Sequence, residues 1–215
     1  SKDVKAYDIP GHRLPTTALI LTKGTLDAAA LNAVAKERGL TVSQFLVAAL
    51  IWAIHTDRSL KTRSGKKPIV VTVPVNLRKL FPSETLRNFV SLMPVVSDGS
   101  ADFEAICACV KGEFEQKLNV DYFMGLVNFN VAVQENPCLK CMPLPLKTAA
   151  MRIGVRSMSD CVTTTMFSNL GIAKTPAEFA DHVARYEFSL SGQSYAGLAA
   201  SAVTFHNRMV VTIAR

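Results

Sequence analysis

PIVVTVPV, residues 68–75, is a nearly continuous run of valine and isoleucine. Such a run is typical of a central strand that is covered on both faces of a sheet. A second strand-like stretch, Phe89–Val96, follows it after a polar connection. We therefore expect two buried strands near the middle of a layered domain.

Two helices are predicted beside these strands. The stripe formed by Phe103, Ile106, Val110 and Phe114 predicts a helix over residues 102–118. Upstream, TVSQ at residues 41–44 is the pattern of a capping box, in which a threonine and a glutamine satisfy each other's backbone amides. The following helix, 45–55, is apolar on every side and contains the only tryptophan, Trp52, so we expect it to be buried all round.

Weaker patterns extend the prediction to both ends of the chain. Residues 16–22 read as a strand, and a helix is expected to open at Gly24 and Thr25, with Leu26 on its apolar face, and to close at Gly39. Later segments predict helices over 120–134 and 146–158, strands over 162–167, 183–190, 198–205 and 209–213, and a tight hairpin connection at His206–Arg208. The fold class is α/β (α+β), with a mixed β-sheet covered by helices.

Composition indicates a globular domain. The chain has 215 residues, of which 49% are hydrophobic and 19% charged. No stretch approaches the ~18 consecutive apolar residues of a membrane span, and the charged residues 1–10 do not form a signal peptide. The five cysteines are an odd number, which favours a reducing, cytoplasmic location over a disulfide framework.

The net charge of +7 is concentrated in one segment. Residues 57–88 contain eight basic side chains, among them Lys66, Lys67 and Arg78, against Asp57 and Glu84, which leaves a segment charge of +6. Such a patch favours an anionic partner, which could be a phosphorylated cofactor, a carrier protein or nucleic acid. The alternative is a lysine-rich solvated loop. Nucleic-acid binding has little support, because the segment lacks interleaved aromatic residues.

Familiar catalytic motifs are absent from the sequence. None of the four histidines (His12, His55, His182 and His206) belongs to a metal-binding pattern, and no nucleophile elbow or complete phosphate-binding loop occurs. Cys138 and Cys141 form a CxxC pair, predicted to lie in a loop, without the second pair that a structural zinc requires. We predict no metal site, and we interpret the cysteines as incidental rather than redox-active.

Two polar segments border the predicted strands. VPVNLRKLF, residues 73–81, precedes a second polar entry, ETLRNFV at 84–90, and Arg78 is expected to tie this connection down through carboxylate or carbonyl contacts. TTTMFSNLG, residues 163–171, is a threonine-rich strand that ends in Ser-Asn-Leu-Gly. Its hydroxyl groups could line a polar channel, or the segment could be a half-exposed strand followed by a turn.

Together with GLTVSQFLVAAL at 39–50 and AVTFHNRMV at 202–210, these segments resemble, in order and spacing, the C-terminal half of alcohol-acetyltransferase and condensation-domain-like proteins of the chloramphenicol acetyltransferase superfamily. The resemblance implies one lobe of a two-lobed fold, with residues 1–15 as an N-terminal extension or linker and residues 16–215 as the C-terminal lobe. The DFGWG-like motif of some relatives is absent.

The same resemblance implies an acyl-transfer tunnel between two lobes. The superfamily's HHxxxD motif, whose histidine acts as general base, does not occur in this chain, so the missing N-terminal lobe would have to supply it. Ser168 is the implied hydrogen-bond donor to the tetrahedral intermediate. Asn169 and Gly171 would shape the turn, and Thr163 and Thr165 would line the channel.

Three functions remain open at this stage. The first is a coenzyme A- or carrier-thioester-dependent acyltransferase lobe that transfers an acyl group to an alcohol or amine and is inactive alone, with Lys66 and Lys67 meeting the donor. The second is a non-catalytic binding or assembly module of the same fold, and the third is nucleic-acid binding. Under the first two, an isolated lobe would expose the apolar face that meets its partner and could self-associate.

Overall fold

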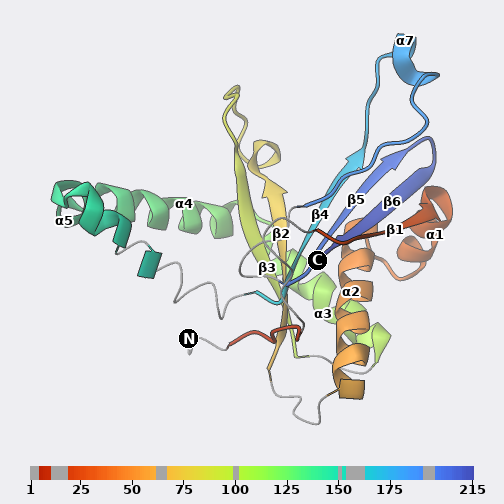
Figure 1. Ribbon diagram of the computed structural model, residues 1–215, viewed down its shortest axis with the longest axis horizontal. Coiled ribbons are helices and arrows are strands. Elements are labelled where there is room, and N and C mark those ends of the chain that lie inside the picture. Colours follow the sequence, from red (N-terminus) through yellow and green to blue (C-terminus); the bar gives the residue numbers. More distant parts are fainter. Residues whose placement is uncertain are drawn as a thin grey trace.

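The computed structural model describes residues 5–10, 19–61, 67–98, 102–149, 152–153, 163–190 and 197–215. Its centre is a six-stranded sheet with the strand order β1-β6-β5-β4-β2-β3 (Figure 1). The strands are β1 (Leu21–Asp27), β2 (Ile69–Asn76), β3 (Val90–Ser97), β4 (Thr165–Ile172), β5 (Ala199–Phe205) and β6 (Arg208–Ala214). β4 runs parallel to its neighbours β2 and β5, and the other pairs are antiparallel. The predicted mixed sheet, and with it the α/β (α+β) class, is confirmed.

Some of the helices lie beside this sheet, and others extend away from it (Figure 1). The helices are α1 (Ala28–Glu37), α2 (Val42–Lys61), α3 (Phe103–Lys117), α4 (Val120–Glu135), α5 (Pro137–Cys141) and α7 (Ala177–Ala180), with a 3-10 turn, η1 (Leu77–Lys79), after β2. Residues 144–149 and 152–153 are also helical, which confirms part of the helix predicted over 146–158. The rest of that prediction, and residues 16–18 of the first predicted strand, lie outside the described residues.

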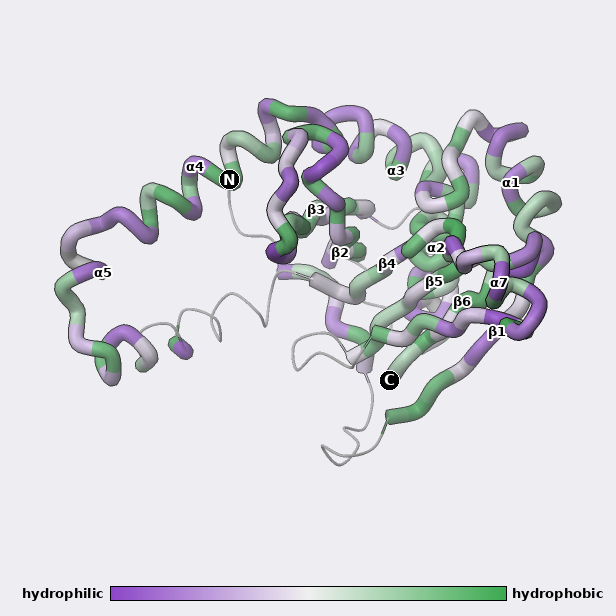
Figure 2. Tube along the Cα trace, turned by 90° about the horizontal axis from the view of Figure 1, so that it is seen from above, coloured by the Kyte–Doolittle hydropathy of each residue, from purple (hydrophilic) through white to green (hydrophobic). Residues whose placement is uncertain are grey.

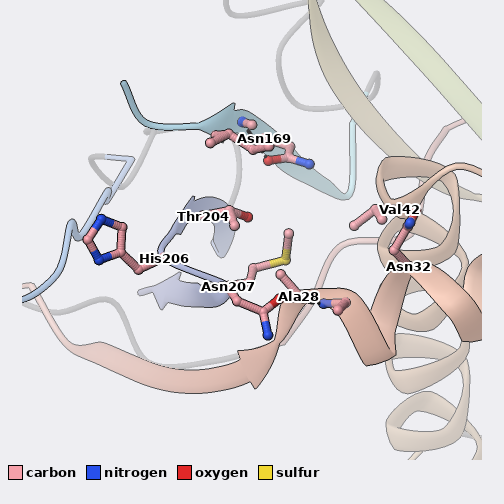
Figure 3. Close-up of a pocket in the computed structure, with 11 residues that line it drawn as sticks. Ala28, Asn32, Val42, Asn169, Thr204, His206 and Asn207 are labelled. Carbon is pink, nitrogen blue, oxygen red and sulfur yellow. Dashed lines mark hydrogen bonds between the residues drawn. The ribbon is translucent and has the colours of Figure 1, made fainter. Parts of the chain in front are cut away.

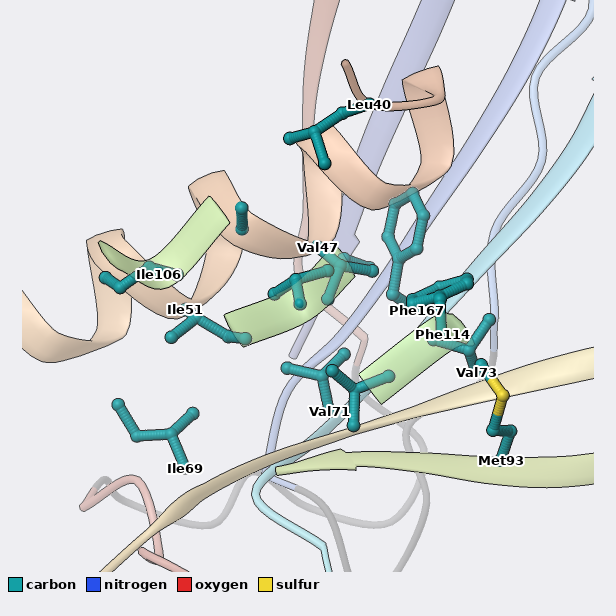
Figure 4. Close-up of a cluster of buried hydrophobic side chains, with 14 of the residues drawn as sticks. Leu40, Val47, Ile51, Ile69, Val71, Val73, Met93, Ile106, Phe114 and Phe167 are labelled. Atoms are coloured by element: carbon teal, nitrogen blue, oxygen red, sulfur yellow. The ribbon is translucent and has the colours of Figure 1, made fainter. Parts of the chain in front are cut away.

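The hydrophobic core fills the layer between the sheet and the helices α2 and α3 (Figure 4). Val47 and Ile51 of α2 and Ile106 of α3 are fully buried against Val71 of β2 and Phe167 of β4. β2 is buried on both faces, as predicted, because Val70 and Thr72 on its other face are also buried. The two predicted central elements, β2 and α3, therefore form opposite walls of one core.

The helix α2 corrects the expectation of all-round burial. Its capping box is present, with Gln44 Oε1 accepting from the Thr41 amide at 2.7 Å and Thr41 Oγ1 accepting from the Gln44 amide at 3.3 Å. Trp52, however, is 45% exposed and contacts Phe103 of α3 edge-to-face. The prediction was wrong because α2 packs on one face of the sheet and beside α3, which leaves its outer side open.

The start of α1 is also corrected. Residues 24–27 continue β1, which pairs with β6 from Leu21–Ala214 to Asp27–Arg208. The helix begins only at Ala28, where the Asp27 side chain accepts a hydrogen bond from the Ala30 amide at 2.8 Å. Leu26 therefore belongs to a strand and not to the predicted helical face. Gly39 does follow the helix in a left-handed conformation, with φ of 64°.

Three further segments differ from their predictions. Ser168–Gly171 continues β4, with a register irregularity between Asn169 and Ile172, instead of forming a turn after it. Residues 183–190, predicted as a strand, have no regular secondary structure and join no strand of the described sheet. The CxxC cysteines lie in the short helix α5 and not in a loop. Pro137 can begin this helix because a backbone amide in the first turn would have no partner within the helix. The hairpin at His206 and Asn207 is confirmed, since both residues have positive φ.

The first described residues contact the lobe. Ala6 is buried, and the Tyr7 amide donates to the Pro68 carbonyl at 2.8 Å. The Arg58 guanidinium lies 5.2 Å from the centre of the Tyr7 ring. This part of the predicted extension, 1–15, thus rests on the base of α2 and β2.

Candidate functional site

β4 occupies the centre of the sheet and carries the SNLG segment at its carboxyl end. Alternate residues of a strand face opposite sides of the sheet, so Ser168 and Asn169 point in opposite directions. Asn169 faces the helices: its amide nitrogen donates to the Ser43 hydroxyl in the first turn of α2 at 3.0 Å. Its carboxamide oxygen accepts from the Gly171 amide at 2.9 Å, while Gly171 takes a φ of 75°. Asn169 thus shapes the end of β4, at the place where the sequence led us to expect a turn.

A cavity of about 470 Å³ opens beside Asn169 and Gly171 (Figure 3). It lies between the carboxyl end of β4, the β5–β6 hairpin, α1 and the start of α2. The lining residues are Ala28, Ala29, Asn32, Val42, Asn169, Gly171, Ile172, Thr204, His206, Asn207 and Met209. Its polar groups are mainly amides and a hydroxyl, on an otherwise apolar wall. This volume falls within the range of small-molecule sites, ~300–1,000 Å³.

The β5–β6 hairpin forms one wall because it is fastened to α1. The Asn207 carbonyl accepts from the Ala28 amide at 2.9 Å, and its side-chain oxygen accepts from the Ala29 amide at 2.8 Å. Asn207 also donates to Asp27 at 3.0 Å. The hydrogen bond from the Ala30 amide, together with the one from the Asn207 side chain, lowers the pKa of Asp27 below its ordinary value.

Four polar residues of the cavity were not predicted as site residues: Asn32, Thr204, His206 and Asn207. The hairpin itself was predicted from residues 206–208. Nothing in the local pattern, however, indicates that this hairpin folds over a helix start about 180 residues earlier. His206 stacks on Phe205, with ring centres 3.9 Å apart, which holds the imidazole at the cavity edge.

Ser168 lies on the opposite face of the sheet, in a row of polar residues. Ser168 pairs with Ser201 of β5, Ser201 pairs with Thr212 of β6, and Thr212 pairs with Lys23 of β1. The Ser201 hydroxyl donates to the Phe188 carbonyl at 2.6 Å. Within the described part of the chain, the buried Thr212 hydroxyl has no hydrogen-bond partner and none is found for Ser168. The structure therefore does not bring Ser168 and Asn169 into one cavity.

The two predicted channel threonines are engaged inside the lobe. The fully buried Thr165 donates to the Leu198 carbonyl at 2.8 Å. Thr163 lies at 2.8 Å from the Thr72 hydroxyl and donates to the Thr165 carbonyl at 2.9 Å. These bonds link β4 to its two neighbouring strands at the end opposite the cavity.

The basic segment is partly structural. Arg58 is buried and donates to the Lys67 carbonyl at 2.7 Å. Arg78 donates to the carbonyls of Thr85 and Arg87 at 2.9 and 2.6 Å, which confirms its predicted role in fixing the connection after β2. Lys67 is exposed, and Lys66 lies outside the described residues.

The remaining ionisable candidates do not converge on the cavity. Burial, and then the charge of Arg58, lowers the pKa of His55. Burial raises the pKa of the thiols of Cys107 and Cys109, which keeps them protonated and unreactive. Among the described residues, no three histidine, cysteine, aspartate or glutamate side chains gather as metal ligands do. No single described helix is long and apolar enough to cross a membrane, although α1 and α2, bent by 82°, meet that criterion as a pair.

This chain has the chloramphenicol acetyltransferase-like fold. The TRI3 trichothecene 15-O-acetyltransferase from Fusarium sporotrichioides matches with a TM-score of 0.58 and 16% identity, over 98% of this chain and 44% of that chain. The EpoB cyclization-docking bidomain of a nonribosomal peptide synthetase from Sorangium cellulosum matches with a TM-score of 0.55 and 12% identity, over 98% and 40%. A wax ester synthase/diacylglycerol acyltransferase from Marinobacter aquaeolei VT8 matches with a TM-score of 0.50 and 13% identity, over 91% and 42%.

These similarities concern the fold, since identities are low throughout. No protein-family model matches the chain, and no curated protein matches it in sequence. The chain spans less than half the length of each of these solved chains. It therefore matches only a part of each of these solved chains.

Proposed function

We propose that this chain is the C-terminal lobe of an acyltransferase that uses a coenzyme A or carrier-bound thioester and acylates an alcohol or amine. The Ser168 hydroxyl carries this proposal, because it has no hydrogen-bond partner within the described residues and lies in the segment on which the resemblance to acyltransferases rests. The cavity beside Asn169 and Gly171 opens on the other face of the sheet, so it is a separate candidate site for a small molecule. The fold shared with acyltransferases supports the same reaction class.

The reaction would require groups from both lobes. A histidine of an HHxxxD motif, supplied by the missing N-terminal lobe, would take the proton of the acceptor hydroxyl or amine. The acceptor oxygen or nitrogen would attack the thioester carbonyl, forming a tetrahedral oxyanion. Its collapse would break the carbon–sulfur bond and release a thiolate, which would take up the proton held by the histidine.

This lobe would contribute positioning and hydrogen bonding. Ser168, whose hydroxyl is uncommitted within the described residues, would donate to the oxyanion. Asn169 and Gly171 would shape the strand end that carries Ser168, with Thr163 and Thr165 bracing β4 at its other end. Because the Thr163 and Thr165 hydroxyls already donate to backbone carbonyls, they are better suited to stabilising β4 than to contacting substrate.

The basic segment would meet the donor. The exposed Lys67 and its neighbour Lys66 would attract the phosphates of coenzyme A or an acidic carrier protein. In the intact protein, Lys66→Ala and Lys67→Ala should raise the apparent KM for the donor and make it less sensitive to salt. Unchanged donor affinity in the double variant would remove this part of the proposal.

The central experiment compares this chain with the intact protein in an acyl-transfer assay. Thiol release from acetyl-coenzyme A would be followed with a panel of alcohols and amines. Activity only in the intact protein supports the proposal. Activity in this chain alone would overturn it, since one of its own histidines would then be the base.

The second candidate is a non-catalytic binding or assembly module of the same fold, in the cytoplasm. It is favoured by one observation: the 215 residues contain neither an HHxxxD nor an HxxxD sequence. The preceding coding sequence separates the two functions, because an HHxxxD motif there supports the enzyme and its absence supports the module.

A further inference from the structure

The segment between α3 and β4 leaves the body of the lobe. Figures 1 and 2 both show α4 and α5 extending away from the sheet. Only the first turns of α4 are held: Phe123 is fully buried and Tyr122 packs against the core. Every residue from 128 to 137 is exposed. We call the helical residues 120–149 the apolar arm.

The exposed part of the apolar arm has the composition of a buried helix. Its large exposed side chains are Met124, Phe129, Val131, Val133, Leu144 and Leu146. The thirteen residues between Asp121 and Glu135 include no charged residue. A helix with so little charge is normally covered by other parts of a protein.

The apolar residues of α4 also point in several directions. Successive residues of a helix are turned by ~100°, so Phe129 and Val133 face one side while Met124 and Val131 face the other. One flat contact would cover only one of these sides. A partner must therefore enclose the helix or receive it in a groove.

We propose that the apolar arm is the surface on which the missing N-terminal lobe of the same polypeptide docks. This inference rests on the proposed two-lobed acyltransferase. In the solved chains of similar fold, more than half of the chain lies beyond the part that this chain matches, so a second body of comparable size is available to cover the arm.

The composition of the arm favours this occupant over a membrane surface. Helices that lie in a membrane interface combine an apolar face with a strongly charged one. Between Asp121 and Glu135 the arm has no charged face at all. An apolar protein surface fits it better than anionic headgroups do.

The first test is the coding sequence upstream of Ser1. An in-frame segment about as long as this chain is expected there. Its absence would overturn the inference, because the proposed occupant would not exist.

The second test uses a photo-crosslinking phenylalanine in the full polypeptide, placed at Phe129 or, as a matched control, at Phe179. The two phenylalanines are 66% and 60% exposed, but Phe179 stands on the short α7, away from the arm (Figure 1). Irradiation should join position 129 to peptides upstream of Ser1, with at least a several-fold higher yield than position 179. Mass spectrometry of the digested adduct identifies the partner peptide.

Other products at position 129 would overturn the inference. Crosslinks to residues 1–215 of a second copy would indicate a dimer surface, and adducts with lipids of added phosphatidylcholine–phosphatidylserine vesicles would indicate a membrane surface. The absence of any adduct would show that the arm stays uncovered. Acyl transfer is measured separately: an upstream crosslink in an inactive protein rejects only the proposed function, and activity without that crosslink rejects only the docking surface.

Discussion

The side-chain amide of Asn169 lies 3.0 Å from the Ser43 hydroxyl, and this hydrogen bond joins the central strand β4 to the first turn of α2 across 126 residues of sequence. The same side chain accepts from the Gly171 amide. Asn169 thus holds together the strand end, the helix start and the cavity between them.

Replacing Asn169 should therefore weaken both the fold and the cavity. Asn169→Ala removes two hydrogen bonds, each worth ~0.5–1.5 kcal/mol, so the free energy of unfolding should fall by about 1–3 kcal/mol. Ser43→Ala removes only one of them and should cost about 1 kcal/mol or less. Urea denaturation of the two single variants and the double variant measures the coupling. Strict additivity would show that the two side chains do not interact in solution.

Gly171 should be needed for its backbone conformation alone. Its φ is 75°, and a Cβ atom added there would meet nothing within 4 Å. Gly171→Ala should thus lower the free energy of unfolding by ~1–2 kcal/mol through backbone strain, without any clash. Gly112 in α3 has equally open surroundings but an ordinary φ, so Gly112→Ala should raise stability by ~0.4–1 kcal/mol. Equal effects of the two changes in thermal melts would contradict this interpretation.

The sequence predicted those elements whose own residues determine their burial. The run of valines predicts a buried strand, β2, and the apolar stripe predicts a helix with one buried face, α3. Both elements pack in the same way in any layered fold. Trp52 shows the limit: an apolar helix surface does not reveal whether a neighbour covers it. The strand at Thr25 and Leu26 shows another, because pairing with β6 overrides a local helix pattern.

The candidate site was predictable only where one segment contains it. Asn169 and Gly171 were identified because the SNLG segment is continuous in sequence. Asn32, Thr204 and Asn207 come from three other elements, and they meet only because β1, β6 and β5 are adjacent in the sheet. The orientation of Ser168 away from Asn169 follows from the continuation of β4, where a turn was expected.

His55 should make the stability of the lobe depend on pH. Burial and the Arg58 charge lower its pKa in the folded chain below the ordinary value of 6.5, so the fold favours the neutral imidazole. This contribution is fully present above the unfolded pKa and is lost as the pH falls from about 6.5 through the folded pKa. Between pH 7.5 and 5, His55→Gln should lose less stability than the parent chain. Parallel curves for the two proteins, from urea denaturation at each pH, would show that His55 makes no such contribution.

Ser168 and Ser201 provide the sharpest test of function. They are paired on adjacent strands, but only the Ser201 hydroxyl has a hydrogen-bond partner among the described residues. Ser201 donates to the Phe188 carbonyl, so Ser201→Ala should cost about 1 kcal/mol of stability. Ser168 has no hydrogen-bond partner within the described residues, so Ser168→Ala should change the free energy of unfolding by less than ~0.5 kcal/mol. If Ser168 donates to the oxyanion, Ser168→Ala should lower kcat of the intact protein by ~10²–10³-fold.

The two readouts separate catalysis from folding. A large fall in kcat for Ser168→Ala with unchanged stability, beside a destabilised but active Ser201→Ala, fits a hydroxyl held ready for the reaction. Full activity of Ser168→Ala would remove Ser168 from the mechanism. Because Ser168 and the Asn169 cavity lie on opposite faces of the sheet, that result would leave the cavity as the surface of this lobe on which to look for the substrate.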